Sequence, residues 1–256
     1  MLLATDIGNT HITIGIFSKD KLVGHWRFSS GVNRTEDECW IMVNILCQSQ
    51  KLDISDITGC VISSVVPDQT PIYATMAEKQ MGVATVVVNS DTDSGLKILY
   101  HDPSSVGADR ICNSVAGFNK YGGPLIIIDF GTATTFDIVS ENAEYLGGII
   151  APGVESSSYA LYRYAARLPR VELKFPDHLI AKTTETSMQA GIMYGIVEMV
   201  NGLVRRLTDE LGKKAQIITT GGMAEQIFEK LQLSVKLEPF LTLDGLRLIY
   251  ERVMTK

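Results

Sequence analysis

The feature that most constrains the fold of this sequence is a pattern that occurs twice, about half the chain apart. The first copy is an apolar run, Leu2–Thr5, that leads into Asp6-Ile7-Gly8-Asn9-Thr10; the second, Leu125–Ile128, leads into Asp129-Phe130-Gly131-Thr132-Ala133-Thr134. Each copy continues into two further strand-like runs separated by a polar turn. The aspartates and the glycines of the two copies share one offset of 123 residues, which is typical of a duplicated protein with two lobes.

An isolated Asp-x-Gly tripeptide is weak evidence, because these residues also form ordinary β-turns. Two copies in matching sequence context favour a functional role. We place the boundary between the lobes near residues 120–124. This predicts an N-terminal lobe of residues 1–120 and a C-terminal lobe of residues 121–256.

Several segments have helical periodicity, so the predicted class is α/β. Thr35–Glu38 has the form of a capping box, and a second helix is predicted from about Ser104-Ser105 to just before Gly122-Gly123. The longest helix is predicted to begin near Thr184. Its apolar stripe is accompanied by methionines on a second side, and a helix that is apolar on two sides must bury both. Either a second subunit covers one side, or the helix lies deep within one lobe and Thr184 is only its N-cap.

The composition limits the classes of function. With 23 Lys plus Arg against 29 Asp plus Glu, the net charge is -6 and the pI about 5.3, which argues against binding to nucleic acid or to anionic membranes. No apolar run reaches the roughly 18 residues of a membrane span, and the start lacks the pattern of a signal peptide, so we expect a cytoplasmic protein. The four cysteines show neither metal-ligand nor disulfide spacing, and we interpret them as reduced packing residues.

The repeated turns have the chemistry of phosphate binding. A turn that presents backbone N–H groups to a phosphate needs a glycine at the closest approach and hydroxyl or amide donors beside it. Both copies supply these, and each follows a carboxylate, Asp6 or Asp129, of the kind that a hard cation prefers. The sequence contains neither GxxxxGK[ST] nor GxGxxG, so two phosphate turns that face each other remain as the nucleotide-binding hypothesis.

Two further segments are candidates for ligand contacts. Gly221-Gly222 follows a predicted strand, where adenine could lie against exposed backbone, although such a pair is usually only a tight turn. Asp109 lies about 160° around its predicted helix from the apolar face, so it can point into a cleft. An exposed aspartate that is favoured by the helix dipole is the alternative.

In their order along the chain, these motifs resemble those of type III pantothenate kinases over essentially the whole sequence. Asp6–Thr10 resembles that family's first phosphate motif, Asp129–Thr135 its second, Thr220–Gly222 its adenosine motif and Gly107–Arg110 its GxDR substrate motif. His11 occupies a position that the family leaves variable. Other segments that match in order are Arg34–Glu38, Gly147–Gly153, Leu168-Pro169, Thr184–Gly191 and Leu243–Arg247.

The resemblance implies a duplicated ribonuclease H-like fold of the actin, sugar-kinase and acetate-kinase superfamily, with two lobes and ATP in the cleft between them. It also implies a homodimer that phosphorylates pantothenate to 4'-phosphopantothenate, the first step of coenzyme A biosynthesis. The implied cofactors are ATP, Mg²⁺ and a monovalent cation, K⁺ or NH₄⁺.

The resemblance further implies roles for individual residues. Asp109 would be the general base, Asp129 would hold the monovalent cation, and Asp6 is a candidate ligand of Mg²⁺. The implied substrate contacts are Tyr100, Gly107, Ala108, Asp109, Arg110 and, from the partner subunit, Thr184. The implied ATP contacts are Asp6, Ile7, Gly8, Asn9, Thr10, His11, Ile12, Thr13, Thr132, Gly221 and Gly222.

Two other functions remain open at this stage. A relative in the same superfamily could phosphorylate a sugar, acetate or another small hydroxylated acid, or could hydrolyse ATP. A non-catalytic regulator is the second alternative, since relatives of this family have been described as accessory factors for transcription. The acidic composition and the lack of a helix-turn-helix signature disfavour direct DNA contact, and the complete Asp109 and phosphate motifs disfavour a loss of catalysis.

Overall fold

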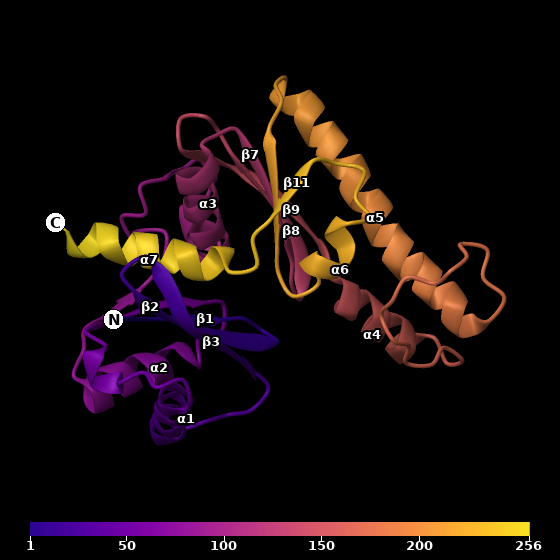
Figure 1. The fold of residues 1–256 in the computed structure, drawn as a ribbon. Helices are drawn as coiled ribbons and strands as arrows, with labels where there is room; N and C mark the ends of the chain where they lie inside the picture. The colour runs from indigo at the N-terminus through magenta and orange to yellow at the C-terminus, as the bar shows by residue number, and fades with distance from the viewer. Residues whose placement is uncertain (256) are drawn as a thin grey trace. The chain divides into compact units, whose positions relative to one another are not determined.

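The computed structural model describes residues 1–255, which divide into two compact units (Figure 1). The first unit combines Met1–Lys120 with the segment that begins at Phe240, and the second is Tyr121–Pro239. One division between the units lies between residues 120 and 121. The C-terminal segment from residue 240 groups with the first unit, whereas the sequence division had assigned it to the second lobe.

The first unit is built on a five-stranded sheet of order β3-β2-β1-β4-β5. Strands β1, β2 and β3 form an antiparallel meander, while β4 and β5 continue the sheet in parallel with β1. The strands of this unit are β1 (Leu2–Ile7), β2 (His11–Ser18), β3 (Lys21–Ser29), β4 (Gly59–Ser64), β5 (Thr85–Val87) and the short β6 (Lys97–Ile98).

Helices cover both faces of this sheet. On β2, Ile14 and Ile16 belong to the core formed with the first two helices. Gly15 points to the other face, because successive residues of a strand alternate between faces, and there it approaches Leu243 of the last helix. The helices are α1 (Glu36–Ser49), α2 (Thr70–Met76), α3 (Ala108–Tyr121) and α7 (Leu241–Met254), with short helical turns η1 (Ile54–Asp56), η2 (Ala77–Met81) and η3 (Pro103–Ser105).

The second unit contains strands in the order β11-β10-β7-β8-β9. Strands β7, β8 and β9 form a second antiparallel meander, and β10 and β11 run parallel to β7. Its core lies between this sheet and the long helix α5, which Figure 1 shows as the orange helix. The elements are β7 (Leu125–Phe130), β8 (Ala133–Val139), β9 (Glu144–Pro152), α4 (Val154–Tyr164), α5 (Thr184–Leu211), β10 (Gln216–Thr220), α6 (Ala224–Phe228) and β11 (Val235–Leu237).

The predicted duplication is confirmed in detail. Strands β1 and β7 have the same length and the same sequence of buried and half-buried residues. Strands β3 and β9 each contain 9 residues, and the second strand of each meander is irregular near its end, between Ile16 and Phe17 in β2 and between Ile138 and Val139 in β8. Each unit therefore presents its Asp-x-Gly turn on an equivalent scaffold.

Two helix starts differ from or refine the sequence predictions. Helix α3 begins at Ala108 rather than near Ser104, because Pro103–Ser105 forms a separate turn and Val106 is extended. Helix α5 begins at Thr184 as predicted, but its N-cap is Thr183, whose hydroxyl accepts from the Thr186 amide. Thr184 therefore has no capping role. The capping box of Thr35 with Glu38 is present as predicted.

The four cysteines are buried free thiols, as predicted. Within residues 1–255, the helices include none that is both long and apolar enough to cross a membrane.

Candidate active site

The first Asp-x-Gly turn reverses the chain tightly between β1 and β2. The Gly8 amide donates to the His11 carbonyl (2.9 Å), and a Cβ on Gly8 would lie 3.0 Å from that oxygen. Asn9 and Thr10 form the exposed tip, and Asp6 is half-buried at the end of β1. The turn thus places an exposed loop beside a carboxylate, as phosphate and cation binding require.

The other predicted ATP contacts of this segment lie in the two strands that flank the turn. The side chains of Ile7 and Ile12 are fully buried and belong to the core, so only their backbone can reach a ligand. Thr13 is half-buried and pairs with Asp6 across the strands. The ring of His11 interacts through Nδ1 with the Arg27 guanidinium (2.9 Å).

The second turn has one residue less between its strands. The Gly131 amide donates to the Ala133 carbonyl (3.1 Å), and Thr132 is exposed at the tip. Gly153, at the start of α4, packs directly against this turn. A Cβ on Gly153 would lie 2.4 Å from the carbonyl oxygens of both Gly131 and Thr132, so only glycine allows this approach.

Serines that sequence reasoning missed brace both turns. The Ser30 hydroxyl donates to the Gly8 carbonyl (2.5 Å), and the Ser156 hydroxyl donates to the Thr132 carbonyl (2.6 Å). Each serine follows the third strand of its meander. Because both serines come after equivalent strands, the duplicated pattern could have identified them.

The predicted adenosine motif lies at the carboxyl end of β10. Because β10 runs parallel to β7, with Thr220 opposite Asp129, the Gly221 turn emerges beside the second Asp-x-Gly turn. Gly221 has a φ of +95°, and a Cβ there would lie 2.4 Å from Asp129 Oδ1 and 2.6 Å from the Phe130 nitrogen. The second unit therefore brings the predicted cation ligand and two predicted ATP-binding segments together.

Asp129 is the carboxylate of this turn. Its Oδ1 lies 3.6 Å from where a Gly131 Cβ would be, whereas the Gly131 and Thr132 carbonyls face Gly153, and the Thr132 carbonyl accepts from Ser156. Since hard cations prefer oxygen ligands, Asp129 is the candidate ligand of a monovalent cation here. Among residues 1–255, no cluster of three or more His, Cys, Asp or Glu side chains is arranged to hold a metal ion.

The predicted substrate motif opens helix α3. Asp109 Oδ1 accepts a hydrogen bond from the Arg110 amide (2.8 Å), and it would lie 2.5 Å from a Cβ on Gly107. Glycine at 107 thus leaves room for the carboxylate to fold back over the helix start. Burial raises the pKa of the Asp109 carboxyl, while the hydrogen bond from the Arg110 amide and the Arg110 guanidinium oppose the rise.

Helix α3 is more deeply buried than its sequence pattern predicted. Residues 110–117 are all buried, including the polar Asn113 and Ser114, so the helix has no solvent-exposed face over this stretch. Burial, with Asp6 and Asp109 nearby, raises the pKa of Cys112 well above its usual range, which keeps the thiol neutral. Because the charges of both carboxylates raise the pKa of the Cys112 thiol, Asp6 and Asp109 both lie near Cys112 in the first unit.

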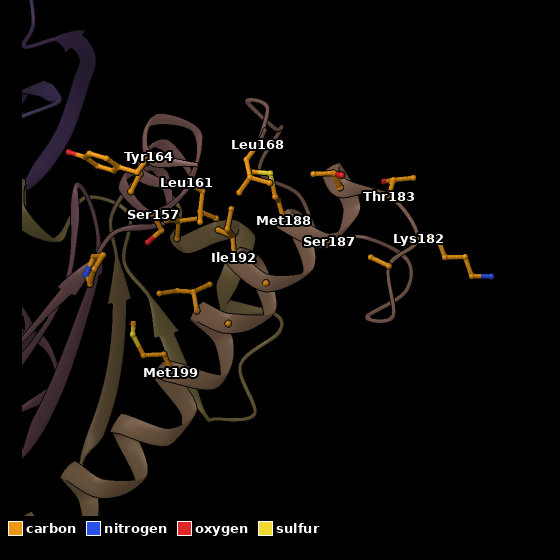
Figure 2. A pocket seen from close by; sticks show the side chains of 18 residues that line it. Ser157, Leu161, Tyr164, Leu168, Lys182, Thr183, Ser187, Met188, Ile192 and Met199 are labelled. Carbon is orange, nitrogen blue, oxygen red and sulfur yellow. The ribbon is translucent and has the colours of Figure 1, made fainter. Parts of the chain in front are cut away.

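The two remaining predicted contacts lie outside these clusters. Tyr100 follows β6 and is 36% exposed. Thr184 lines an apolar groove of about 1120 Å³ between α4 and α5 (Figure 2). Figure 2 shows Leu161 and Tyr164 of α4 on one side of this groove and Met188 and Ile192 of α5 on the other.

Comparisons with known proteins identify the family of this chain. The family model described as type III pantothenate kinase matches residues 2–206. A type III pantothenate kinase from Moorella thermoacetica is 47% identical over 98% of this chain and 99% of its own length. The chain belongs to the type III pantothenate kinase family. A second member of this family, from Bacillus cytotoxicus, is 43% identical over 98% of this chain and 96% of its own length.

Solved structures give the fold class. A Baf family transcriptional activator from Campylobacter jejuni aligns with a TM-score of 0.61 at 18% identity and covers 99% of this chain and 100% of its own. A ROK family glucokinase from Streptomyces griseus, solved with glucose and AMPPNP, aligns with a TM-score of 0.53 at 11% identity over 100% of this chain and 99% of its own. These structures share the fold of this chain, so the predicted α/β fold with two lobes is confirmed.

Proposed function

We propose that this protein transfers the γ-phosphoryl group of ATP to the primary hydroxyl of pantothenate and so forms 4'-phosphopantothenate, the first step of coenzyme A biosynthesis. The observation that carries the proposal is the Gly107–Arg110 segment, which holds a half-buried carboxylate at the start of α3 within a full-length match to named pantothenate kinases. We also propose that the reaction takes place in the cytoplasm, as the sequence pattern suggests.

In the proposed mechanism Asp109 orients the pantothenate hydroxyl and accepts its proton as the oxygen attacks phosphorus. Phosphoryl transfer needs an oriented nucleophile and neutralised charge more than covalent assistance. Arg110 supplies a permanent positive charge for an anionic group of the substrates. Tyr100, Gly107 and Ala108 would complete the pantothenate contacts.

The phosphates of ATP would bind to the Gly8–Thr10 and Gly131–Thr134 turns, and the adenosine to Gly221-Gly222. Mg²⁺, when bound with ATP, would neutralise phosphate charge, and Asp6 is the carboxylate proposed to help hold it. The exposed tips and the serine braces support this assignment, because they keep the turns in one conformation without covering them.

A coupled assay of ADP release tests the function. With ATP, Mg²⁺ and K⁺, we expect release that depends on pantothenate and that does not occur with acetate, glucose or no acceptor. ADP release without an acceptor would identify an ATPase, and release with a sugar would identify a different kinase. A protein that binds ATP but shows no turnover with any acceptor would support the non-catalytic alternative.

The proposed monovalent cation site gives a sharp prediction. Asp129→Ala should abolish the response to K⁺ or NH₄⁺, because it removes the carboxylate at the start of the second Asp-x-Gly turn. Rates are measured in potassium, ammonium, sodium and choline chloride at matched ionic strength. Glu141→Ala is the control, since it removes an exposed carboxylate of the same unit that pairs with Lys213. Equal wild-type rates in all four salts would disprove the cation site.

We further propose that the active protein is a homodimer formed through the α4–α5 groove. Exposed apolar side chains gather around it: Tyr164 is 88% exposed and Ile180 is 85% exposed. On α5, a Cβ at Gly191 or Gly195 would meet nothing within 4 Å, so this face of the helix is uncovered within one chain. The occupant we propose is a second copy, because Thr184, the residue that the family resemblance assigns to the partner's substrate pocket, lies in this groove.

A shared pocket predicts rescue in mixed dimers. Asp109→Asn and Thr184→Arg subunits should each be inactive alone, yet random re-pairing should give one intact pocket in about half of the dimers, or about a quarter of wild-type activity. Activity is measured after joint unfolding and refolding. No recovery in confirmed heterodimers would contradict the shared pocket.

Gly191→Arg tests the interface itself. The new side chain fits within one chain but would fill the groove, so we expect an inactive monomer by light scattering. Ile41→Arg, which changes an exposed apolar residue of α1 in the other unit, should remain a dimer. A Gly191→Arg protein that stays dimeric would rule out this surface.

A further inference from the structure

The last helix, α7, contacts α3 at an unusually short distance. A Cβ on Gly245 would lie 2.0 Å from the carbonyl oxygen of Cys112, 2.5 Å from its carbonyl carbon and 2.8 Å from its Cα. These are backbone atoms of a helix, which do not move aside as the end of a side chain can. Any side chain at 245 would therefore push α3 away from α7.

A hydrogen bond marks the same contact. One turn before Gly245, the Thr242 hydroxyl donates to Asn113 Oδ1 (2.8 Å); Asn113 is fully buried and Thr242 is half-buried. Helix α7 therefore meets α3 at two successive residues, Cys112 through the backbone and Asn113 through its side chain. Figure 1 shows α7, in yellow, crossing α3 at a steep angle.

The contacted turn is the one that carries the catalytic carboxylate. In an α-helix the N–H of residue 113 bonds to the carbonyl of residue 109, so Asn113 lies one turn beyond Asp109. Asp109 itself is held by the Arg110 amide at the helix start. A shift of α3 at Cys112 would move this first turn, and the Asp109 carboxylate with it.

Helix α7 is fixed against the first sheet, so it can set the position of α3. It lies on the first sheet, where a Cβ on Gly59 would meet Tyr250 Oη at 1.9 Å, and Arg252 forms an ion pair with Asp93 (2.8 Å). Its apolar face is buried: Leu241, Leu243, Leu246 and Ile249 are each at most 2% exposed. The helix thus transmits the position of the sheet, which also carries Asp6 and the first phosphate turn, to α3.

We propose that Gly245 is a positioning residue for Asp109. By lacking a side chain it lets α7 lie against the α3 backbone at Cys112, and this contact, with the Thr242–Asn113 hydrogen bond, sets the position of the carboxylate relative to the first phosphate turn. The inference rests on the proposed role of Asp109 as the base. Gly245 belongs to the Leu243–Arg247 segment, which lies beyond residues 2–206 that the family model matches.

Gly245→Ala is the direct test. We expect kcat to fall about 10-fold to 100-fold while the KM for ATP stays within about twofold, because a misplacement of roughly 1 Å can cost about 100-fold in rate. The acid limb of the kcat–pH profile should also move, since the surroundings of the Asp109 carboxylate change. A merely structural role would lower thermal stability and leave both kcat per folded molecule and the pH profile unchanged.

Gly123→Ala is the matched control. A Cβ on Gly123 would lie 2.2 Å from the carbonyl oxygen of Ser140, a backbone clash of the same kind that involves neither α3 nor α7. This variant should lower the melting temperature but leave kcat and the pH profile of the folded protein intact. An equal fall in kcat for Gly123→Ala would overturn the proposal, and so would near-normal kcat in a folded Gly245→Ala protein.

If Gly245→Ala does not fold, two variants of Thr242 test the same proposal. Thr242→Val removes the hydrogen bond to Asn113 at similar volume and should lower kcat several-fold, whereas Thr242→Ser should restore it. Unchanged kcat in Thr242→Val would overturn the proposal. If Asp109→Asn kept its activity, the role of Asp109 as the base would be refuted. If Asp109→Asn were inactive while Gly245→Ala folded and had a normal kcat, only the positioning role of Gly245 would be refuted.

Discussion

Asp109→Asn is expected to lower kcat by about 100-fold to 10,000-fold, the usual cost of removing a general base. The asparagine keeps the size of the side chain, and its Oδ1 can still accept from the Arg110 amide, so the helix start should be preserved. The KM for ATP should change little. The measurement is steady-state ADP release at saturating pantothenate, and near-normal turnover in the variant would contradict the assignment of the base.

The same variant should be at least as stable as the wild type at neutral and alkaline pH. Burial raises the pKa of Asp109 above its ordinary value of 3.8, so the folded protein holds this proton more tightly than the unfolded chain. The contribution of Asp109 to stability therefore falls as pH rises from the ordinary value through the raised one. Removing the buried charge relieves this cost, which thermal unfolding at pH 8 would measure.

The pH profile follows from the same shift. A base acts only when it is deprotonated, so wild-type kcat should fall, as pH is lowered, around a pKa above that of an ordinary aspartate. Asp102→Asn is the control: Asp102 is exposed, seven residues before Asp109, and caps the η3 turn through a hydrogen bond from the Ser104 amide that asparagine can also accept. It should keep both the rate and the pH profile.

Gly221→Ala is expected to have the second large effect. The alanine would adopt a φ of +95° and place its Cβ 2.4 Å from Asp129 Oδ1 and 2.6 Å from the Phe130 nitrogen. The left-handed conformation alone costs about 1–2 kcal/mol, and the crowding adds about 1–3 kcal/mol. Since the displaced groups belong to the second phosphate turn and the proposed cation site, kcat/KM for ATP should fall about 10-fold or more.

Gly212→Ala separates the two causes. Gly212 has a φ of +64°, but a Cβ there meets nothing within 4 Å. This variant should show only the conformational cost in denaturant unfolding and should retain its kcat/KM for ATP. If Gly221→Ala behaved like Gly212→Ala in both measurements, the close approach to Asp129 would have no functional importance.

Local sequence patterns predicted the repeated elements well. The strand, turn and meander around each Asp-x-Gly copy depend on residues close together in the sequence: alternating apolar side chains, and a glycine where the chain reverses. The capping box at Thr35 and the start of α5 at Thr184 are local in the same way. The start of α3 was predicted too early, because a proline turn and an extended Val106 precede it.

The site motifs were found from the sequence, but their supports were not. Asp109 and Gly107 are neighbours along the chain, so a short motif can encode their contact. Gly221 and Asp129 are distant in sequence, and their approach depends on the parallel pairing of β10 with β7. No local pattern records such a pairing.

By itself, the sequence determined the duplicated α/β architecture, the two Asp-x-Gly turns and the family, because these depend on short motifs and their order. Only the tertiary structure decided that α7 belongs to the first unit, that Gly245 lies against the α3 backbone, and that Ser30 and Ser156 brace the turns. The physical reason is that packing between distant segments is set by the shape of both surfaces. A single glycine or serine in the sequence does not show which backbone it will meet.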